Sequence, residues 1–295
     1  MNPNQNRTNP NARFFLKRAV IFLILGICVF PVFWALWFML TGALMPLDEL
    51  KATIGPVLQE QPETLASWTL FPTWPTLQPL VELLLDTPQF FVMFWNSFRL
   101  VVPSVAGQFL VGAPAAWALS RLRFRGRKLL FTLYIVLMLM PFQVTMVPNY
   151  LMINTLGLMD TIWSVILPFA FSAFPVFIMT KGFDSVQRPL IEAAQVDGAG
   201  HLRIFLQIGL PIGMPSILAA LVLGFLECWN AIEQPMVFLK TSSNWPLSLY
   251  LPQIASEQLG LAMAASLLML MPAALVFLFG QKYLVLGIQS AGLKE

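Results

Sequence analysis

The sequence predicts an all-α membrane protein that crosses the bilayer six times. Of its 295 residues, 58% are hydrophobic and only 11% are charged, whereas about 25% of the residues in soluble domains are charged. The chain contains several continuous apolar runs that reach the roughly 20 residues a helix needs to cross a bilayer. Because these runs do not alternate polar and apolar residues with a period of two, helices are favoured over a β-barrel.

Six apolar runs are the expected transmembrane spans. Several contain proline, which is tolerated in membrane helices where neighbouring groups satisfy the freed carbonyls. We interpret these prolines as packing kinks, with hinges of a gate as the alternative. The runs are residues 19–44, 91–120, 129–153, 162–180, 216–239 and 260–283.

Basic residues indicate the orientation of the spans. Of the 17 Lys and Arg residues, 14 fall before the first span, in the second-to-third and fourth-to-fifth links, or after the core of the last span. The positive-inside rule places these segments in the cytoplasm, together with both termini. The sequence therefore predicts a cytoplasmic N-terminal tail (1–18), one transmembrane domain (19–283) and a cytoplasmic C-terminal tail (284–295).

The links differ in length and composition. The expected external loops are residues 45–90 and 240–259, and the expected long cytoplasmic loop is residues 181–215. The basic link 121–128 lies between two spans, so anionic lipid headgroups are a better partner for it than nucleic acid.

Enzyme and metal signatures are absent from the sequence. It contains no GxxxxGK[ST] phosphate loop, no HExxH and no CxxC. The single histidine rules out a histidine-based metal or haem centre built from this chain alone. We therefore expect no catalytic residue, no metal site and no cofactor bound by this chain.

Three polar residues fall within the predicted fifth span. Glu227, Asn230 and Glu233 are spaced by three residues, so on one helix all three lie within a third of its circumference. A carboxylate at membrane depth must face protein or water. Two interpretations stay open: a polar stripe that lines a solute path, and hydrogen bonding to a neighbouring helix or subunit.

The stretch 192–215 is polar in an otherwise apolar chain. Glu192 falls in the first turn of an expected short helix, and Asp197 and Gly198 are typical turn residues. A second amphipathic stretch follows and ends near Pro211. Residue properties alone leave open a rigid knob beside the membrane or an ordinary connector.

The same stretch matches the pattern EAA, two residues, DGA, five residues, Phe, then Leu-Pro and a second Pro. The residues that match are Glu192, Ala193, Ala194, Asp197, Gly198, Ala199, Phe205, Leu210, Pro211 and Pro215. This resembles the EAA loop of ABC-importer permeases. Segments 96–98, 117–128, 137–161 and 287–295 resemble the carbohydrate-uptake branch of that family, with the permeases of maltose transporters as the nearest likeness.

The resemblance implies the type I ABC-importer permease fold in a cytoplasmic (inner) membrane. It implies pairing with a second homologous permease, two ATPase subunits that use ATP and Mg²⁺, and an extracytoplasmic sugar-binding protein. The implied cargo is a di- or oligosaccharide. A stand-alone secondary carrier of small solutes is the alternative, and an intramembrane enzyme is disfavoured because no nucleophile–base or metal constellation is found.

The resemblance also implies roles for particular residues. The third external loop would contact the binding protein, with Asn244, Trp245 and Pro246 as candidates. The EAA loop would dock on the ATPases. The residues expected to couple to the ATPases are Glu192, Ala193, Ala194, Asp197, Gly198, Ala199, Phe205 and Pro211.

Overall fold

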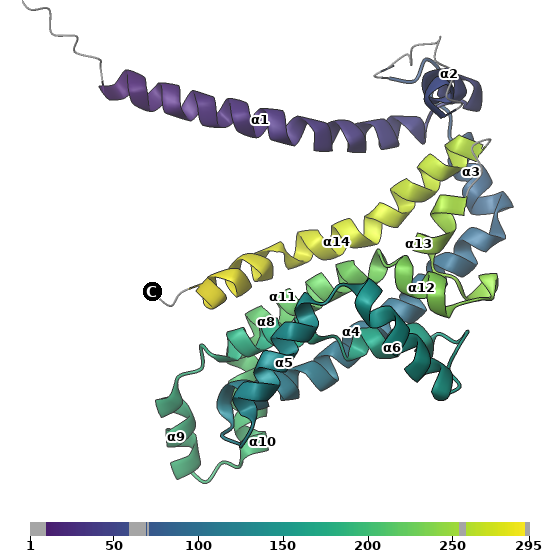
Figure 1. Cartoon of the computed structure of the whole chain (residues 1–295). Coiled ribbons are helices and arrows are strands. Elements are labelled where there is room, and N and C mark those ends of the chain that lie inside the picture. The colour runs from purple at the N-terminus through teal and green to yellow at the C-terminus, as the bar shows by residue number, and fades with distance from the viewer. Residues whose placement is uncertain (1–9, 59–68, 70, 254–257, 293–295) are drawn as a thin grey trace, which may run out of the picture. The chain divides into compact units, whose positions relative to one another are not determined.

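A computed structural model describes residues 10–58, 69, 71–253 and 258–292 of the chain. Helices and their connections account for all of these residues, without a strand among them, so the all-α prediction is confirmed there. The chain divides into two compact units (Figure 1). The first comprises residues 1–83 and 255–267, and the second comprises residues 84–254 and 268–295. Each unit is described by itself.

The first unit folds the predicted external loop around a few close contacts. It contains α1 (Pro10–Gly42), α2 (Leu47–Leu58), α3 (Gln78–Val81) and the first residues of α14 (Leu259–Gly292). The Glu49 carboxylate accepts hydrogen bonds from the backbone amide and the hydroxyl of Thr73, at 3.0 and 2.9 Å to Oε1. The part of this loop that the structure describes is therefore held in a defined conformation.

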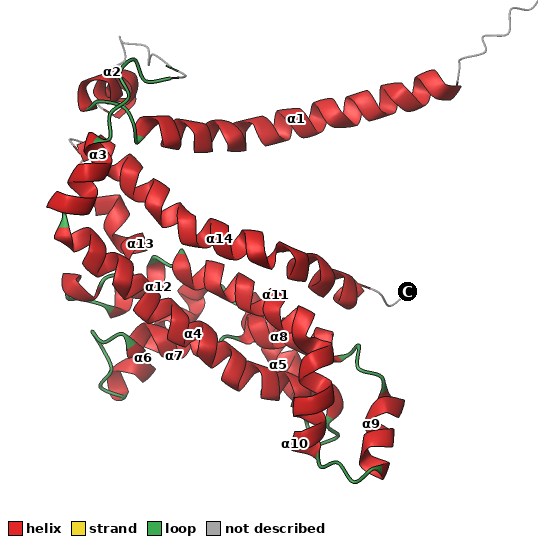
Figure 2. Ribbon diagram, turned by 180° about the vertical axis from the view of Figure 1, so that it is seen from behind, coloured by secondary structure: helices red, strands yellow, loops and turns green. Residues whose placement is uncertain are grey.

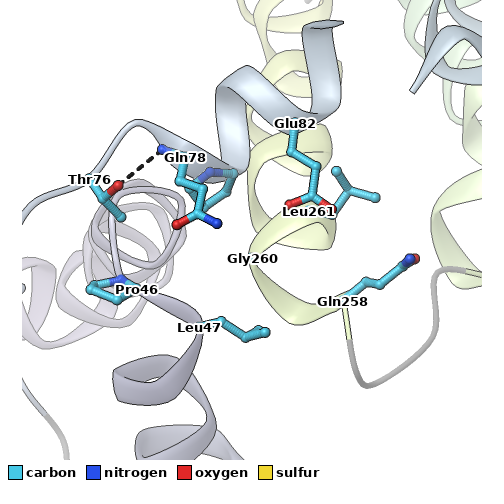
Figure 3. Close-up of a pocket in the computed structure, with 9 residues that line it drawn as sticks. Pro46, Leu47, Thr76, Gln78, Glu82, Gln258, Gly260 and Leu261 are labelled. Atoms are coloured by element: carbon cyan, nitrogen blue, oxygen red, sulfur yellow. Dashed lines mark hydrogen bonds between the residues drawn. The ribbon is translucent and has the colours of Figure 1, made fainter. Parts of the chain in front are cut away.

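A small pocket of about 140 Å³ lies within this unit. Figure 3 shows Thr76, Gln78 and Glu82 around it, together with Gln258, just before α14, and Gly260 in the first turn of α14. The Thr76 hydroxyl accepts a hydrogen bond from the Gln78 amide at 3.1 Å and so fixes the turn that enters α3.

The second unit contains the other helices. A π-helical segment, η1 (Glu82–Asp86), leads into it. Its helices are α4 (Pro88–Arg121), α5 (Arg127–Leu139), α6 (Phe142–Thr155), α7 (Trp163–Ala170), α8 (Ala173–Phe183), α9 (Arg188–Val196), α10 (His201–Ile204), η2 (Phe205–Gly209), α11 (Leu210–Trp229), α12 (Glu233–Phe238), η3 (Ser242–Asn244), α13 (Leu247–Tyr250), η4 (Leu251–Gln253) and the remainder of α14.

The core of the second unit lies where α4, α7, α8 and α11 pack together. One buried cluster includes Trp117, Phe183 and Phe205, and another includes Val165 and Trp229. The two clusters lie toward opposite ends of the bundle, since α10 lies at one end and α12 at the other in Figure 2. Side chains from helices distant in the sequence therefore meet at both ends.

A buried amide on α4 contacts both α7 and α11. Gln108 on α4 is 1% exposed and donates from Nε2 to the carbonyl oxygen of Phe169 at 3.1 Å. A Cβ at Gly224 of α11 would lie 2.0 Å from Oε1 of Gln108. The absence of a side chain at Gly224 therefore lets α11 approach Gln108.

The predicted count of spans agrees with the structure once a broken helix is counted as one. Five helical segments of the described chain are long and apolar enough to cross a membrane, and α5 with α6 makes a sixth if the pair is one span. These two helices meet at an angle of 108°. The predicted span 129–153 is therefore broken in the structure, at one of the prolines interpreted as packing kinks or hinges.

Proline chemistry explains this break. Met140, which precedes Pro141, is extended at φ −73° and ψ 125°, as expected because the ring of a following proline disfavours the helical region. α5 alone has 13 residues, or about 20 Å at 1.5 Å per residue, which is short of a hydrocarbon core about 30 Å thick.

The helices at the two ends of the chain are longer than the predicted spans. α1 already begins at Pro10, inside the predicted tail 1–18, and α14 continues to Gly292, inside the predicted tail 284–295. The first nine and the last three residues lie outside the described part. The assignment of both tails to the cytoplasm stays a prediction.

Candidate functional site

The candidate site is the loop 181–215, which we call the EAA loop. It leaves the bundle at the end of α8 and returns into α11. In Figures 1 and 2, α9 and α10 lie at one end of the second unit, and α12 and α13 lie at the opposite end. Pro189 falls in the first turn of α9, where the missing amide hydrogen has no helical partner to lose.

A tight turn ends α9 at the DGA part of the motif. The Ala199 amide donates to the Ala194 carbonyl at 2.9 Å, and the Gly198 amide donates to the Gln195 carbonyl at 3.0 Å. Gly198 has φ +81°. This pair of hydrogen bonds with a left-handed residue is a Schellman motif, and a side chain at that φ costs about 1–2 kcal/mol. Glycine at position 198 is therefore explained by the turn.

The EAA loop has an inner face that packs on the bundle. Ile191, Ala194 and Ala199 pack against the buried cluster that contains Trp117 and Phe183. Small side chains at 194 and 199 bring the turn close to that cluster. The inner face fixes the position of α9.

The outer face of the loop is exposed. Glu192, Ala193, Asp197 and Gly198 all lie on it. Val196 lies there too, at 88% exposed.

Leu202 of α10 is a further apolar side chain in the open, at 70% exposed. Together with Val196 it gives the protruding loop two exposed apolar side chains among polar ones. Leu202 was not among the predicted coupling residues, and only its exposure distinguishes it from the apolar residues that follow it.

Phe205 has a different position from the other motif residues. It is 8% exposed, and its ring centroid lies 5.8 Å from that of Trp117 and 6.2 Å from that of Phe183. It therefore faces the interior of this chain. The coupling role of Phe205 stays a prediction, and from this position the ring would contribute to it by anchoring the loop rather than by forming the docking surface.

Two glycines receive the aromatic rings of this anchor. A Cβ at Gly209 would lie 2.7 Å from Cζ3 of Trp117, and a Cβ at Gly213 would lie 2.5 Å from Cε1 of Phe183. Pro211 lies between them in the first turn of α11 and is exposed. The chain thus re-enters the bundle directly beneath the aromatic cluster.

Polar contacts tie the helices that hold the loop. Arg121 at the end of α4 donates from Nε and Nη2 to the Phe183 carbonyl, at 2.8 and 2.6 Å. The neighbouring Ser120 hydroxyl donates to Oδ1 of Asp184 at 2.7 Å. These long-range contacts were not predicted, since Arg121 had been assigned only to the basic link.

A basic cavity of about 530 Å³ lies between this link and α9. Arg121, Arg123, Arg188 and His201 line it, together with Glu192 of the motif. The motif glutamate thus lines the same cavity as three arginines.

The three polar residues predicted for the fifth span do not share one helix. α11 ends at Trp229, and Asn230 caps it by donating from Nδ2 to the Leu226 carbonyl at 2.8 Å. Glu233 begins the separate helix α12. The expectation that the three residues share one helix is therefore wrong, because α11 ends before the last two members of the set.

The two acids of this set have different surroundings. Oε1 of Glu233 accepts a hydrogen bond from Nε2 of Gln143 on α6 at 2.8 Å, whereas Glu227 is exposed on the surface of this chain. Glu233 thus has the neighbouring-helix partner that one of the two interpretations required. A role of these residues in a solute path stays a prediction.

At the opposite end of the bundle, Asp160 organises the loop 240–245. Its carboxylate accepts hydrogen bonds from the Lys240 and Thr241 amides, at 2.8 and 2.9 Å, and a short one from the Thr241 hydroxyl. The Thr241 hydroxyl, followed by these amides, lowers the pKa of Asp160 below its usual range. Asp160 has φ +59°, a conformation that aspartate tolerates better than most residues.

The residues predicted to contact a binding protein hold this loop together within the chain. Asn244 donates from Nδ2 to the Asp160 carbonyl at 3.1 Å, Trp245 donates from Nε1 to the Leu239 carbonyl at 3.1 Å, and Pro246 is buried. Ser242 and Ser243 are the exposed residues of the turn. The predicted contact with a binding protein stays a prediction.

A metal centre has no support in the described part of the chain. No group of three or more His, Cys, Asp or Glu side chains among those residues is arranged to hold a metal ion.

Comparison with known proteins identifies relatives along most of the chain. Protein LplC of Bacillus subtilis is 28% identical, covering 86% of this chain and 90% of its own. An arabinooligosaccharides transport system permease protein, AraQ of Halalkalibacterium halodurans, is 26% identical, covering 98% of this chain and 99% of its own.

A similar fold occurs in the crystal structure of a bacterial ABC transporter involved in the import of the acidic polysaccharide alginate. That structure matches with a TM-score of 0.75 at 22% identity, covering 94% of this chain and 98% of the other. The predicted permease fold is confirmed.

Residues 108–289, more than half of the chain, match the family described as binding-protein-dependent transport system inner membrane component. The match includes the whole EAA loop, α8 and α11, and α4 from Gln108 onward. The likeness to maltose permeases in particular stays a prediction. The chain is a multi-pass membrane protein and belongs to the binding-protein-dependent transport system inner membrane component family of ABC-transporter permeases.

Proposed function

We propose that this chain is one of two permease subunits of a saccharide importer and that its EAA loop docks on partner ATPases. The observation that carries the proposal is the construction of the loop. Its outer face exposes Glu192, Asp197 and Gly198, while Phe205 is locked against Trp117 and Phe183 inside the bundle. A force applied to the outer face therefore reaches α4, α8 and α11 through packed rings.

The saccharide cargo is inferred from the relatives. The name of AraQ refers to arabinooligosaccharides, and the transporter of similar fold is involved in the import of a polysaccharide. A di- or oligosaccharide is therefore the cargo we propose for this chain. The choice of sugar would rest with the binding protein and the second permease as well.

The proposed topology follows from charge. The segments rich in Lys and Arg include the EAA loop and the link 121–128, so both lie in the cytoplasm by the positive-inside rule. The loop 240–245 then faces the outside, where a binding protein would deliver the sugar. ATP and Mg²⁺ would be used by the partner ATPases, and this chain would bind neither.

Purification of the complex tests the proposal. We expect the tagged chain to bring down a second permease and two ATPases, and we expect ATP hydrolysis to rise when sugar-loaded binding protein is added. A single chain that transports sugar by itself in liposomes would instead establish a stand-alone carrier and overturn the proposal.

Substitutions on the outer face test the docking role. Glu192→Lys and Gly198→Asp should leave the permease in the membrane but reduce the amount of ATPase that copurifies with it. Gly200→Ala is the matched control, because Gly200 has an ordinary φ of −73° and open space for a Cβ. If both variants retained the ATPases at the level of the control, the docking role would be refuted.

A further inference from the structure

A cavity of about 310 Å³ lies at the end of the bundle opposite the EAA loop. It is formed between the first turns of α4 and the segment 242–250. Seven described residues line it: Gln89, Val92, Met93, Ser242, Ser243, Trp245 and Tyr250. We propose that this cavity binds one ring of a neutral saccharide on the external side, before the sugar enters the membrane path. This inference rests on the proposed function.

The chemistry of the lining suits a sugar ring. A pyranose or furanose presents C–H groups on its faces and hydroxyls around its rim. Trp245 and Tyr250 provide flat aromatic groups for the C–H face. The Gln89 amide and the hydroxyls of Ser242 and Ser243 both donate and accept hydrogen bonds, as sugar hydroxyls require.

The polar lining groups are available for a ligand. Gln89, Ser242 and Ser243 are exposed. None of the side-chain hydrogen bonds found within the described residues uses the amide of Gln89 or the hydroxyls of these two serines.

The backbone around the cavity is fixed in advance. Asn96 on α4 donates from Nδ2 to the Ser243 and Trp245 carbonyls, at 2.6 and 3.2 Å. The Leu247 amide donates to the Ser97 hydroxyl at 2.9 Å, and the Asp160 carboxylate holds the start of the turn. A site that is already ordered loses less entropy when a ligand binds.

The position of Trp245 is also fixed. The hydrogen bond from its Nε1 to the Leu239 carbonyl satisfies the polar edge of the indole and sets the plane of the ring. Part of Trp245 packs against the cluster that contains Trp229, and the part that lines the cavity favours a sugar face over a further hydrogen-bonding group.

The charge of the lining and the size of the cavity limit which ligands it can bind. None of the seven described lining residues is ionisable near neutral pH, so a neutral saccharide is favoured over a uronic acid. The volume of about 310 Å³ is at the lower end of small-molecule sites, which span roughly 300–1,000 Å³. This size suits one ring rather than a whole oligosaccharide.

Protection of an introduced thiol tests this site directly. The native thiols are removed by Cys28→Ser and Cys228→Ser, Ser242→Cys is introduced, and the purified complex without binding protein reacts with a maleimide. The probes are maltotriose, arabinotriose and lactose, with galacturonic acid as the charged comparison. We expect at least one neutral sugar to slow labelling about threefold at twice its dissociation constant.

Two variants test whether the lining residues are responsible for the protection of the introduced thiol by sugar. In the Ser242→Cys background, Gln89→Ala and Tyr250→Ala should each raise the sugar concentration for half-maximal protection by about 3- to 10-fold. Lys240→Cys, close in sequence but outside the lining, is the control and should label at the same rate with and without sugar.

The outcomes separate this inference from the proposed function. If the wild-type complex and its binding protein take up no saccharide, the proposed function fails. If they take up saccharide but no neutral sugar protects Ser242→Cys, or only galacturonic acid does, the inference alone is overturned. Absence of protection together with weaker attachment of the binding protein in Tyr250→Ala would show a protein-docking surface instead.

Discussion

Gly182→Ala should loosen the base of the EAA loop, because Gly182 lies where α8 and α11 touch. An ideal Cβ at position 182 would be 2.1 Å from Cβ and 2.4 Å from Oγ of Ser216. Carbon atoms pack at about 3.5–4.0 Å, so the overlap is about 1.4 Å or more. The obstructing Cβ is attached directly to the backbone, so a rotamer change cannot remove the clash and the helices must separate.

The expected cost of this overlap is about 1–3 kcal/mol in the free energy of unfolding, the range found for overpacked cores. The clash can be relieved from the other side. With Ser216→Gly, the nearest remaining atom of residue 216 is its Cα, at an ordinary 3.6 Å. Ser216→Gly alone should also destabilise, by roughly 0.5–1 kcal/mol for glycine inside a helix and through the contacts of the serine itself.

A double-mutant cycle measures the energetic coupling between positions 182 and 216. The apparent melting temperature of the purified complex is recorded at one scan rate for wild type, both single variants and the double variant, since unfolding of such complexes depends on scan rate. We expect the double variant to melt above Gly182→Ala, which is opposite to an additive loss.

The control for this cycle is Gly200→Ala, which adds the same methyl group into open space and should melt near the wild type. If Gly182→Ala melted as the control does, or if Ser216→Gly only added its own loss, the close approach of α8 and α11 would be wrong.

Three further expectations concern the two ends of the bundle. Phe205→Ala should destabilise the complex by about 3–5 kcal/mol, seen as a large fall in melting temperature, and a surface-only role for this ring would leave melting unchanged. Gly198→Ala should cost about 1–2 kcal/mol for the left-handed φ, unlike Gly200→Ala, and equal melting of the two would contradict the turn. Hydrogen bonds from the external loop hold the folded-state pKa of Asp160 below its usual value. The stabilisation from these hydrogen bonds is therefore fully present above about pH 3.9. It is lost as the pH falls through the lowered pKa and the carboxylate is protonated. A spin label at Ser242→Cys should therefore gain mobility only in acid, and mobility that is already high at neutral pH in wild type would argue against the tie.

The sequence was sufficient for the spans and for the motif, because apolar length and residue spacing are local properties. It was insufficient where a helix breaks. Met140 before Pro141 carried a signal for an extended residue, but membrane helices often tolerate proline, so the two outcomes could not be separated. Asn230 likewise suits a helix end, yet apolar residues continue to position 239 and concealed the stop after Trp229.

The contacts that position the site could not be predicted because they join residues far apart in the chain. Periodicity identifies an apolar face but does not say which ring meets which glycine. Trp117 and Gly209 are 92 positions apart, and the hydrogen bonds from Arg121 reach the carbonyl of Phe183. These pairs follow only from the packing of α4 against α8 and α11.

The structure separates two requirements that the EAA motif combines. Glu192 and Asp197 are exposed, and their identity therefore matters to whatever meets the loop. Ala194, Gly198 and Phe205 serve the fold of this chain: Gly198 permits the turn, Ala194 packs its small side chain against the buried cluster, and Phe205 enters that cluster. The spacing of the motif follows from the second requirement, since the turn must end where Phe205 can reach Trp117. A foreign EAA loop should therefore retain its fold only if Ala194, Gly198 and Phe205 are kept, whereas Glu192 and Asp197 can be exchanged to match a different partner.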